Sequence, residues 1–327
     1  MDTTVMYRLD PDERRPAAPP QYRSARRRVR PFATTVVVLF SLFLAVVLGA
    51  HRLIPDIGEW TMGLESFLPW LGLLSVVLLI PAIRSRSWAA WFAWLVPVVV
   101  WAITFVPAIL PGNTTAVGQG TLSVATQNLE GDNGSLSANA ALIAKNADLV
   151  ALQEVKNPEV LGELLAKYPY QERVGTVALL SKFPFKDSAG LDLKGFSSYR
   201  ALHATVQSPS GNLSVYVIHG ASVSGGDHQA RDEMLTDLQQ RVRQDSSQRI
   251  LVLGDFNAAP TNRIMDNFNN QLEEKLSSSG GFGFSWPSSF PATRPDHILS
   301  KGLKINEAEV LAPIGSDHLG LASKFSF

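Results

Sequence analysis

Three long stretches without a charged residue occupy the first third of this 327-residue chain and constrain its fold more than any other feature. They run from Phe32 to Ala50, from Ser66 to Ile83 and from Ser87 to Leu110. A helix needs about 20 apolar residues to cross the hydrocarbon core of a bilayer, and a core helix of a soluble domain rarely runs so far without a charge. The sequence therefore predicts three transmembrane helices within residues 32–110. The first is too long for a cleaved signal peptide and lacks a small-residue cleavage site.

The placement of arginine predicts how these helices are oriented. Five arginines lie between positions 23 and 30, just before the first helix, and Arg84 and Arg86 lie in the short turn between the second and third. The loop between the first and second helices carries only Arg52, together with three acidic residues. Positive charge stays on the cytoplasmic side of a membrane. We therefore expect a cytoplasmic N-terminus and, after three crossings, an extracytoplasmic location for everything beyond residue 110.

Composition divides the rest of the chain. Residues 1–31 are expected to be a basic cytoplasmic tail, and about the first 20 of them, which are rich in charge and proline, are expected to be disordered. Residues 111–120 form a short polar linker, and residues 121–327 form one α/β domain. There is no cysteine, which excludes disulfides, a Cys-ligated metal and a thiol nucleophile. The domain is slightly acidic and has no Lys/Arg cluster, which argues against nucleic acid as its main partner.

After residue 120 the pattern alternates between short apolar runs, which predict strands covered on both faces, and helix-like segments. Three helices are expected, at Ser137–Asn146, Pro158–Lys167 and Gln229–Gln244. The expected strands are Thr121–Asn128, Asp148–Val155, Thr176–Ser181, Ala201–Val206, Leu213–His219, Arg249–Gly254, Asp296–Leu299 and Leu321–Phe327.

Polar or ionisable side chains recur at the ends of these strands, where a rigid scaffold commonly presents functional groups. Each alone is weak evidence, since a Glu after a strand is usually solvated and a single His is usually a core residue. The tetrapeptide GDFN is stronger, because residues two apart at an extended strand end can point the same way. The set comprises Asn128, Glu154, His219, Asp255 and Asn257 of GDFN, Asp296, and the Asp317–His318 pair.

The order of these motifs resembles the endonuclease/exonuclease/phosphatase superfamily. The resemblance covers nearly all of residues 121–327 through TQN, LQE, the His that ends SVYVIH, GDFN and the DH…SDH pair. It implies a four-layer α/β/β/α sandwich, here preceded by three transmembrane helices. Two departures stand out: Ile218 precedes the strand-end His where the family commonly has Thr or Asn, and Gln127 replaces a frequent aromatic residue. These differences bear on specificity more than on chemistry.

The resemblance also implies roles for the residues of the set and a divalent cation, Mg²⁺ or Mn²⁺, which prefers oxygen ligands. Glu154 is expected to be the main metal ligand, with Asn128 and Asp317 nearby. Arg200 fits a phosphate contact and a surface ion pair equally well, so it stays outside the core set. The expected catalytic residues are Asp255, which takes a proton from water with help from Asn257, His219 and His318, which stabilise the phosphoryl oxygens, and Asp296, which orients His318.

Three spans followed by such a domain also resemble actinobacterial membrane proteins linked to teicoplanin resistance. This implies a lipid-linked phosphate or pyrophosphate, such as a polyprenyl carrier of wall synthesis, as substrate and membrane lipids as partners. A tether at the bilayer raises the effective concentration of the domain for such substrates. Two alternatives stay open: an extracytoplasmic nuclease, and a membrane-tethered binding module without catalytic activity.

Overall fold

A computed structural model of the chain describes residues 30–57, 59–111, 120–131, 141–142, 145–196, 198–223 and 228–327. Within these ranges, three helical segments are long and apolar enough to cross a membrane. They run over Pro31–Leu53, Leu68–Ser85 and Trp88–Ile109, close to the stretches expected from the sequence. The expected tail lies mostly outside the described residues, as do most of the linker and of the helix at Ser137–Asn146.

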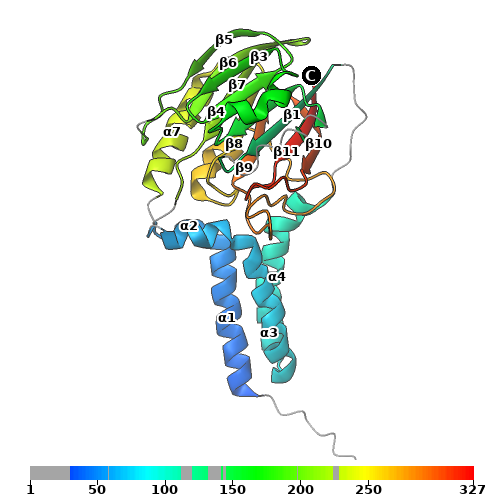
Figure 1. Cartoon of the computed structure of the whole chain (residues 1–327). Coiled ribbons are helices and arrows are strands. Elements are labelled where there is room, and N and C mark those ends of the chain that lie inside the picture. The colour runs from blue at the N-terminus through cyan, green and yellow to red at the C-terminus, as the bar shows by residue number, and fades with distance from the viewer. Residues whose placement is uncertain are drawn as a thin grey trace, which may run out of the picture.

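The apolar helices stand side by side under the α/β domain, and a short helix, α2, lies across their domain end (Figure 1). The Arg30 N–H donates to the Ser85 carbonyl at 3.1 Å, so the start of α1 and the end of α3 meet at the end away from the domain. The helical elements are α1 (Pro31–Ala50), η1 (His51–Leu53), α2 (Glu59–Ser66), η2 (Leu68–Leu71), α3 (Gly72–Ser85), α4 (Trp88–Ile109), η3 (Pro158–Leu161), α6 (Gly162–Leu165), α7 (Gln229–Gln244), η4 (Arg263–Met265) and α8 (Asp266–Asn269).

The described strands form two sheets. One has six strands in the order β10-β11-β1-β2-β4-β3, and the other has five in the order β5-β6-β7-β8-β9. Each sheet contains one parallel pair, β1 with β2 and β7 with β8. The strands are β1 (Thr121–Asn128), β2 (Leu149–Gln153), β3 (Tyr170–Val174), β4 (Val177–Ser181), β5 (Phe185–Gly190), β6 (Ala201–Ser208), β7 (Gly211–His219), β8 (Ile250–Asp255), β9 (Asp296–Lys301), β10 (Lys304–Val310) and β11 (Leu321–Ser326).

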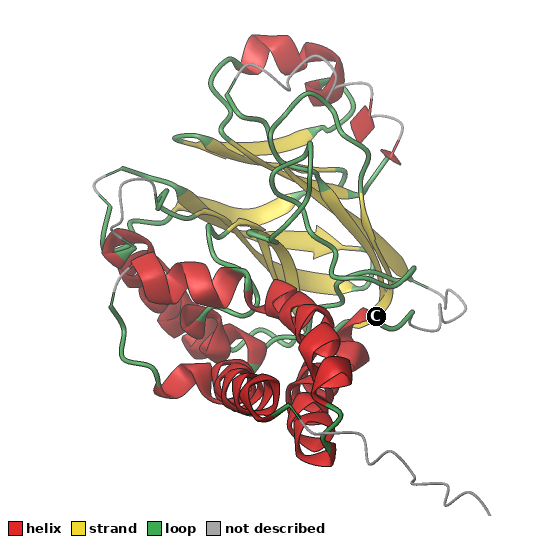
Figure 2. Ribbon diagram, turned by 90° about the horizontal axis from the view of Figure 1, so that it is seen from below, coloured by secondary structure: helices red, strands yellow, loops and turns green. Residues whose placement is uncertain are grey.

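The two sheets pack face to face, with helices outside each of them (Figure 2). The central core joins alternate residues of both sheets, such as Val124 and Leu179 from one and Val217 and Leu253 from the other. A second apolar cluster packs α7 against the outer face of the five-stranded sheet, and a third covers the outer face of the six-stranded sheet. The four-layer α/β/β/α sandwich expected from the sequence is therefore confirmed.

Strands that are buried on both faces were predictable from the sequence, whereas three edge strands were not. All eight predicted strands are present, and the missed ones, β3, β5 and β10, lie at the edges of their sheets. Edge strands carry polar, exposed residues, as in the YQERV segment of β3, and so show no continuous apolar run. The helix expected at Pro158–Lys167 is shorter, a 3₁₀ turn followed by one turn of α6.

Buried polar contacts join the domain to α2. The Glu65 side chain is 1% exposed and accepts hydrogen bonds from the Arg263 backbone N–H at 2.8 Å and from its Nε at 2.9 Å. Arg52, just after α1, reaches the same carboxylate at 3.1 Å and Asp266 at 2.6 Å. Breaking a buried ion pair is costly because it leaves a charge without compensation. The position of the domain on α2 is therefore fixed.

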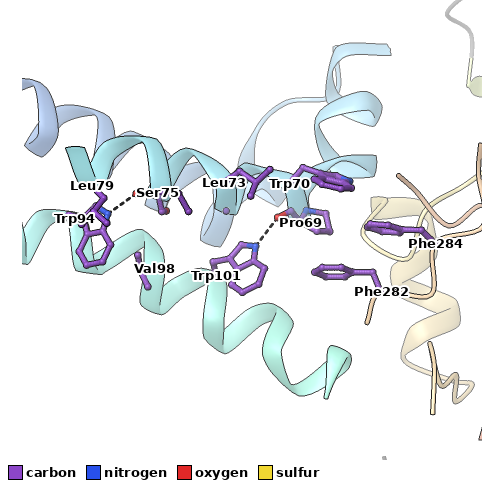
Figure 3. Close-up of a pocket in the computed structure, with 12 residues that line it drawn as sticks. Pro69, Trp70, Leu73, Ser75, Leu79, Trp94, Val98, Trp101, Phe282 and Phe284 are labelled. Carbon is purple, nitrogen blue, oxygen red and sulfur yellow. Dashed lines mark hydrogen bonds between the residues drawn. The ribbon is translucent and has the colours of Figure 1, made fainter. Parts of the chain in front are cut away.

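Aromatic side chains make a second junction, deeper among the apolar helices (Figure 3). Phe284 stacks on Trp70 with ring centroids 5.8 Å apart, and Phe282 meets Trp101 edge-on at 6.4 Å. These rings close one end of an apolar cavity of about 400 Å³ between α3 and α4. The Trp101 and Trp94 indole N–H groups donate to backbone carbonyls, which satisfies them where no water competes.

Candidate active site

The topology gathers the ends of five strands at one end of the sandwich. Because β1 and β2 are parallel, their carboxyl ends lie together and bring Asn128 beside the residue that follows β2, Glu154. Because β7 and β8 are parallel, His219 pairs in register with Asp255. The antiparallel strand β9 begins opposite Asp255, since Asp296 is its partner. His318 lies shortly before β11, the neighbour of β1.

Two carboxylates from different sheets meet at Asn128. Its Nδ2 donates to Asp255 Oδ2 at 2.9 Å and lies 3.4 Å from Glu154 Oε1, while its Oδ1 accepts from the Glu130 N–H at 2.9 Å. Asp255 is 1% exposed, and its Oδ1 accepts the backbone N–H of Asn257 at 2.8 Å. Burial above all, and the nearby Asp296, raise the pKa of Asp255 to about 6. Asp255 is therefore suited to take up a proton near neutral pH.

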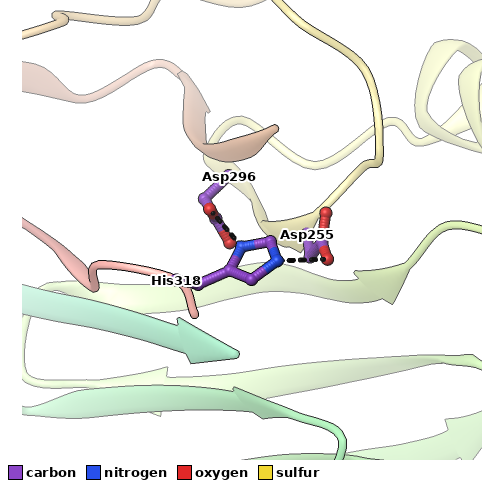
Figure 4. A group of neighbouring side chains, drawn as sticks. All are labelled: Asp255, Asp296 and His318. Carbon is purple, nitrogen blue, oxygen red and sulfur yellow. Dashed lines mark hydrogen bonds and ion pairs between the residues drawn. The ribbon is translucent and has the colours of Figure 1, made fainter. Parts of the chain in front are cut away.

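A carboxylate and an imidazole face Asp255 from the other side (Figure 4). His318 Nδ1 lies 2.8 Å from Asp296 Oδ2, and its Nε2 lies 3.8 Å from Asp255 Oδ2. The Ser285 hydroxyl donates to the same Asp296 oxygen at 2.6 Å. Burial opposes the charged imidazolium, but Asp296 and then Asp255 outweigh it and raise the pKa of His318 to about 10. His318 is therefore a cation at neutral pH, with Nε2–H directed at the centre of the site.

His219 is held differently, by Arg200. Arg200 Nη2 lies 2.5 Å from His219 Nε2, and Arg200 Nε donates to the His219 carbonyl at 3.0 Å. Burial, and then the charges of Arg200 and His318, hold the pKa of His219 well below its usual value. His219 is therefore a neutral imidazole whose Nε2 accepts a hydrogen bond from the Arg200 guanidinium. The same Nε2 lies 3.6 Å from Glu154 Oε1. On this side the positive charge that faces the carboxylates belongs to Arg200.

The backbone is unusual at two residues of the site. Glu154 has φ 57° and Asn257 has φ 49°, in the left-handed region that non-glycine residues seldom adopt. Such conformations persist where surrounding contacts fix them, and they cluster at functional sites. Asn257 Nδ2 donates to the Gly220 carbonyl at 3.1 Å, which ties the end of β7 to the end of β8. The glycine of GDFN, Gly254, is required because a Cβ there would clash with the Ile218 carbonyl.

Asp317 lies at the rim of the site. Its side chain is 44% exposed, and its Oδ1 is 4.0 Å from His318 Nε2. Its Oδ2 accepts from the Trp286 indole at 3.2 Å, and its N–H donates to Glu130 at 3.0 Å. Its contact with the rest of the predicted set therefore runs through His318.

The side chains present fit a hard divalent cation. Asn128 Nδ2 contacts the carboxylates of both Glu154 and Asp255, and Asp296 Oδ1 is buried without a hydrogen-bond partner among the described residues. Donor atoms of Asp255, Asp296 and His318 lie within 4.8 Å of one another. The Nδ1 of His318 is already engaged by Asp296. An oxygen-rich set of this kind suits Mg²⁺ or Mn²⁺.

A cavity of about 350 Å³ opens beside this cluster. His318 and Asn257 line it on the domain side, together with Trp286. Met62 and Phe67, from α2 and the residue after it, line the opposite side. The candidate site therefore faces the membrane-proximal helix rather than the far side of the domain.

All eight side chains predicted from the sequence lie at this one end of the sandwich. Reasoning from the sequence left out Arg200, whose position just before β6 gave no more than an even choice between phosphate contact and surface pair. It also missed Ser285, which lies in a Gly/Ser-rich loop, and the α2 residues, which read as an acidic loop between two spans. These contacts join segments far apart in the chain, so spacing carries no signal for them.

Comparisons with known proteins agree with this fold. The model of the endonuclease/exonuclease/phosphatase family matches residues 125–318. Truncated TDP2 of Caenorhabditis elegans is 17% identical with a TM-score of 0.52, over 63% of this chain and 98% of that one. The 3′ phosphatase NExo from Neisseria, bound to product DNA hairpin, is 19% identical with a TM-score of 0.52, over 63% and 100%.

A third similar structure is a mutant of beta toxin from Staphylococcus aureus with bound magnesium ions. It is 16% identical with a TM-score of 0.50, over 64% of this chain and 100% of the toxin. At such identities the likeness to solved structures establishes the fold alone. No curated protein matches the sequence.

Proposed function

Because the chain belongs to the endonuclease/exonuclease/phosphatase family, whose members are phosphoester hydrolases, we propose that it hydrolyses a lipid-linked phosphate or pyrophosphate at the outer surface of the membrane. The observation that carries the proposal is the cluster of buried Asp255 and His318 with half-buried Glu154, beside a cavity that α2 lines. The reaction needs Mg²⁺ or Mn²⁺, as in the family. The active site is extracytoplasmic.

Glu154 would hold the metal ion, with Asn128 and Asp317 as further oxygen ligands. The ion, when bound, neutralises phosphoryl charge and lowers the pKa of a bound water. For Asn128 this role would use Oδ1, which accepts from the Glu130 N–H in the structure. The carboxylate of Glu154 lies within reach of both Asn128 and His219.

The remaining residues bind the phosphoryl group and move protons. Asp255 Oδ2 accepts a proton from the attacking water, since its raised pKa makes it a better base than an ordinary Asp. Asn257 keeps the carboxylate in place through its backbone N–H. His318, charged and oriented by Asp296, donates from Nε2 to a phosphoryl oxygen and stabilises the negative charge that develops there.

Arg200 joins this set. Its guanidinium is partly buried, and the negative charges of Asp255 and Glu154 are close enough to attract it. A guanidinium offers a planar fork of donors that matches phosphate oxygens. Arg200 therefore binds the phosphoryl group beside His219, and His219 holds the guanidinium in place through Nε2.

A membrane-borne substrate is supported by the apolar helices and by the direction in which the cavity opens. Three segments are long enough to cross a bilayer, and α2, at their domain end, forms one wall of the cavity. The start of α1 and the end of α3, where Arg30 bonds to Ser85, lie at the opposite end. By the distribution of positive charge, that end is cytoplasmic.

The proposal is tested with the full chain in lipid nanodiscs, supplied with Mg²⁺ or Mn²⁺. The substrates are polyprenyl pyrophosphate, phospholipids, sphingomyelin, inositol phosphates and DNA, with wild type and Glu154→Gln compared in parallel. We expect phosphate release from the polyprenyl substrate, abolished by EDTA and by the substitution. Equal activity of both proteins, or none on any substrate, would exclude the enzyme.

Preferential cleavage of DNA, with a steep loss of rate on adding salt, would instead identify an extracytoplasmic nuclease. Orientation has its own test, a periplasm- or exterior-dependent reporter fused after residue 115. A signal from a cytoplasmic reporter at that point would overturn the proposed topology.

A further inference from the structure

We propose that the membrane-proximal helix α2 is part of the substrate site, and that it binds the apolar part of a lipid phosphoester next to the phosphoryl group. This rests on the proposed function and adds a specificity element outside the family domain, since the family match begins only at residue 125. The residues that carry the inference are Met62, Gly63 and Phe67, which line the same cavity as His318.

Met62, Gly63 and Phe67 form one wall of this cavity, and hydrogen bonds join that wall to the loop that follows Asn257. Asn262 is 1% exposed, and its Oδ1 accepts the Ala259 N–H at 2.7 Å. Its Nδ2 donates to the Met62 carbonyl at 3.2 Å and lies 3.1 Å from the Ser66 hydroxyl. A single buried amide thus links the loop after GDFN to α2. Buried polar groups that are fully paired hold neighbouring segments in one arrangement.

Neighbouring contacts reinforce this link. The Thr261 hydroxyl donates to the Glu65 carbonyl at 2.6 Å, and Arg52 Nη1 donates to the Thr261 carbonyl at 2.7 Å. With the Glu65–Arg263 pair, they fasten residues 261–263 to the membrane-proximal segment. The cavity wall formed by Met62, Gly63 and Phe67 is therefore held in one position relative to the loop that follows Asn257.

The polar and apolar residues of the cavity are unevenly placed. Its ionisable residue, His318, comes from the domain together with Asn257, whereas α2 and the residue after it present the apolar side chains of Met62 and Phe67 and one hydroxyl, that of Ser66. Ala258, Ala259, Pro295 and Trp286 add apolar surface from the domain. Phe67 is 42% exposed although it is apolar and lies in a cavity wall. A ligand with a phosphoryl group at one end and a hydrocarbon stem at the other matches this division, and its stem leaves toward the helices that span the membrane.

Gly63 gives the wall its space. A Cβ built on Gly63 meets no atom within 4 Å, although the residue lies inside a helix where glycine is unfavourable. A larger side chain fits the fold at this position and would occupy the cavity. The open space is therefore a feature that can be filled without disturbing the packing around it.

The experiment uses full-length protein in nanodiscs and a series of alkyl phosphates with four, eight and sixteen carbons. The readout is the ratio of kcat/KM for the longest chain to that for the shortest. We expect Phe67→Ala to lower this ratio by about tenfold, as the loss of one apolar side-chain contact predicts. We expect Gly63→Leu to lower it by a similar factor, because the leucine side chain would occupy the space of the hydrocarbon stem. Trp60→Ala, on the same helix but 81% exposed and outside the cavity, should keep the wild-type ratio.

A second readout does not depend on turnover. A sixteen-carbon phosphate with a photoreactive group near the headgroup should crosslink to residues 62–67 in the Glu154→Gln protein, as located by mass spectrometry. Unchanged ratios in both variants, with crosslinks elsewhere, would overturn the role of α2 while leaving the hydrolase intact. Absence of activity on every chain length in the wild type would instead overturn the proposed function.

Discussion

Two buried carboxylate–histidine pairs stand on adjacent residues of β9 and do different things. Asp296 binds His318 with an O–N distance of 2.8 Å, and the next residue, His297, binds Glu274 at 2.9 Å. Side chains alternate across a strand, so one pair faces the site and the other faces away from it. The pairs are similar in composition, in burial and in length of the hydrogen bond.

They differ in what the second imidazole nitrogen meets. His297 Nε2 bonds to the Ala258 carbonyl at 2.8 Å, and Glu274 is also bound by Arg294 at 3.0 Å, so both partners are fully used. His318 Nε2 instead points toward Asp255 and a cavity, and its nearest partner among the described residues is Asp255 Oδ2 at 3.8 Å. The open nitrogen, rather than the carboxylate–histidine pair itself, distinguishes a catalytic candidate from a structural one.

The largest expected effect comes from removing the imidazole of the Asp296–His318 pair, whose Nε2 faces the cavity. His318→Gln removes the cation that faces the phosphoryl oxygens, and we expect kcat to fall about 10³-fold, as for loss of one transition-state donor. Steady-state kinetics on the best substrate of the panel measures it. His203→Gln, at a histidine near the start of β6 that is bonded to Ser214 and lies outside the candidate set, is the matched control and should keep wild-type kcat. A similar loss in both would contradict the distinction drawn here.

The second effect concerns the Glu274–His297 pair, both of whose partners are fully hydrogen-bonded, and it changes the stability of the fold. Glu274→Gln leaves Arg294 and His297 buried with less compensation, and we expect the free energy of unfolding to fall by about 3 kcal/mol. In a domain of this size that lowers the apparent Tm by about 10 °C. Thermal unfolding of the detergent-solubilised chain tests it, with the exposed neighbour Glu273→Gln as control. Activity per folded molecule should stay near wild type. A loss of kcat without a loss of stability would contradict the structural role of the Glu274–His297 pair.

The stability that the Glu274–His297 pair contributes should depend on pH in the acid range. Burial alone would raise the pKa of Glu274, but His297 and Arg294 outweigh it and lower that pKa from 4.5 to about 2. The contribution to stability is therefore present above about pH 4.5 and is lost as the pH falls toward 2. We expect the stability difference between wild type and Glu274→Gln to shrink by about 2 kcal/mol between pH 7 and 3. Unfolding measured across that range checks it, and a constant difference would argue against the lowered pKa.

The sequence could predict the central strands and the residues at their ends, but not which polar residue belongs to which network. Apolar runs in the sequence indicate β2, β7 and β8. The parallel pairing of β1 with β2 then places Asn128 beside the end of β2, and that of β7 with β8 places His219 beside Asp255. The three edge strands carry polar residues on exposed faces and leave no such pattern.

Long-range contacts set the rest. Nothing local in SYRAL distinguishes an Arg200 that binds His219 from one that pairs on the surface. Glu274 and His297 are 23 positions apart, and Asn262 lies 196 positions from Ser66. Such pairs depend on how loops fold back on the sandwich. The strand ends and the motif order therefore indicated candidate residues that the structure brings together, whereas the contribution of α2 required the structure.

The smallest effect sharpens the comparison from within the open pair. Ser285→Ala removes the hydroxyl that donates to Asp296 Oδ2 at 2.6 Å but keeps the bond to His318. A typical hydrogen bond contributes about 1 kcal/mol, and because this one acts on His318 only through Asp296, kcat should fall no more than about fivefold with KM nearly unchanged. Ser300→Ala, a buried serine at the other end of β9, is the control. If Ser285→Ala changes Tm but not kcat, the serine supports packing only, and the orientation of His318 depends on Asp296 alone.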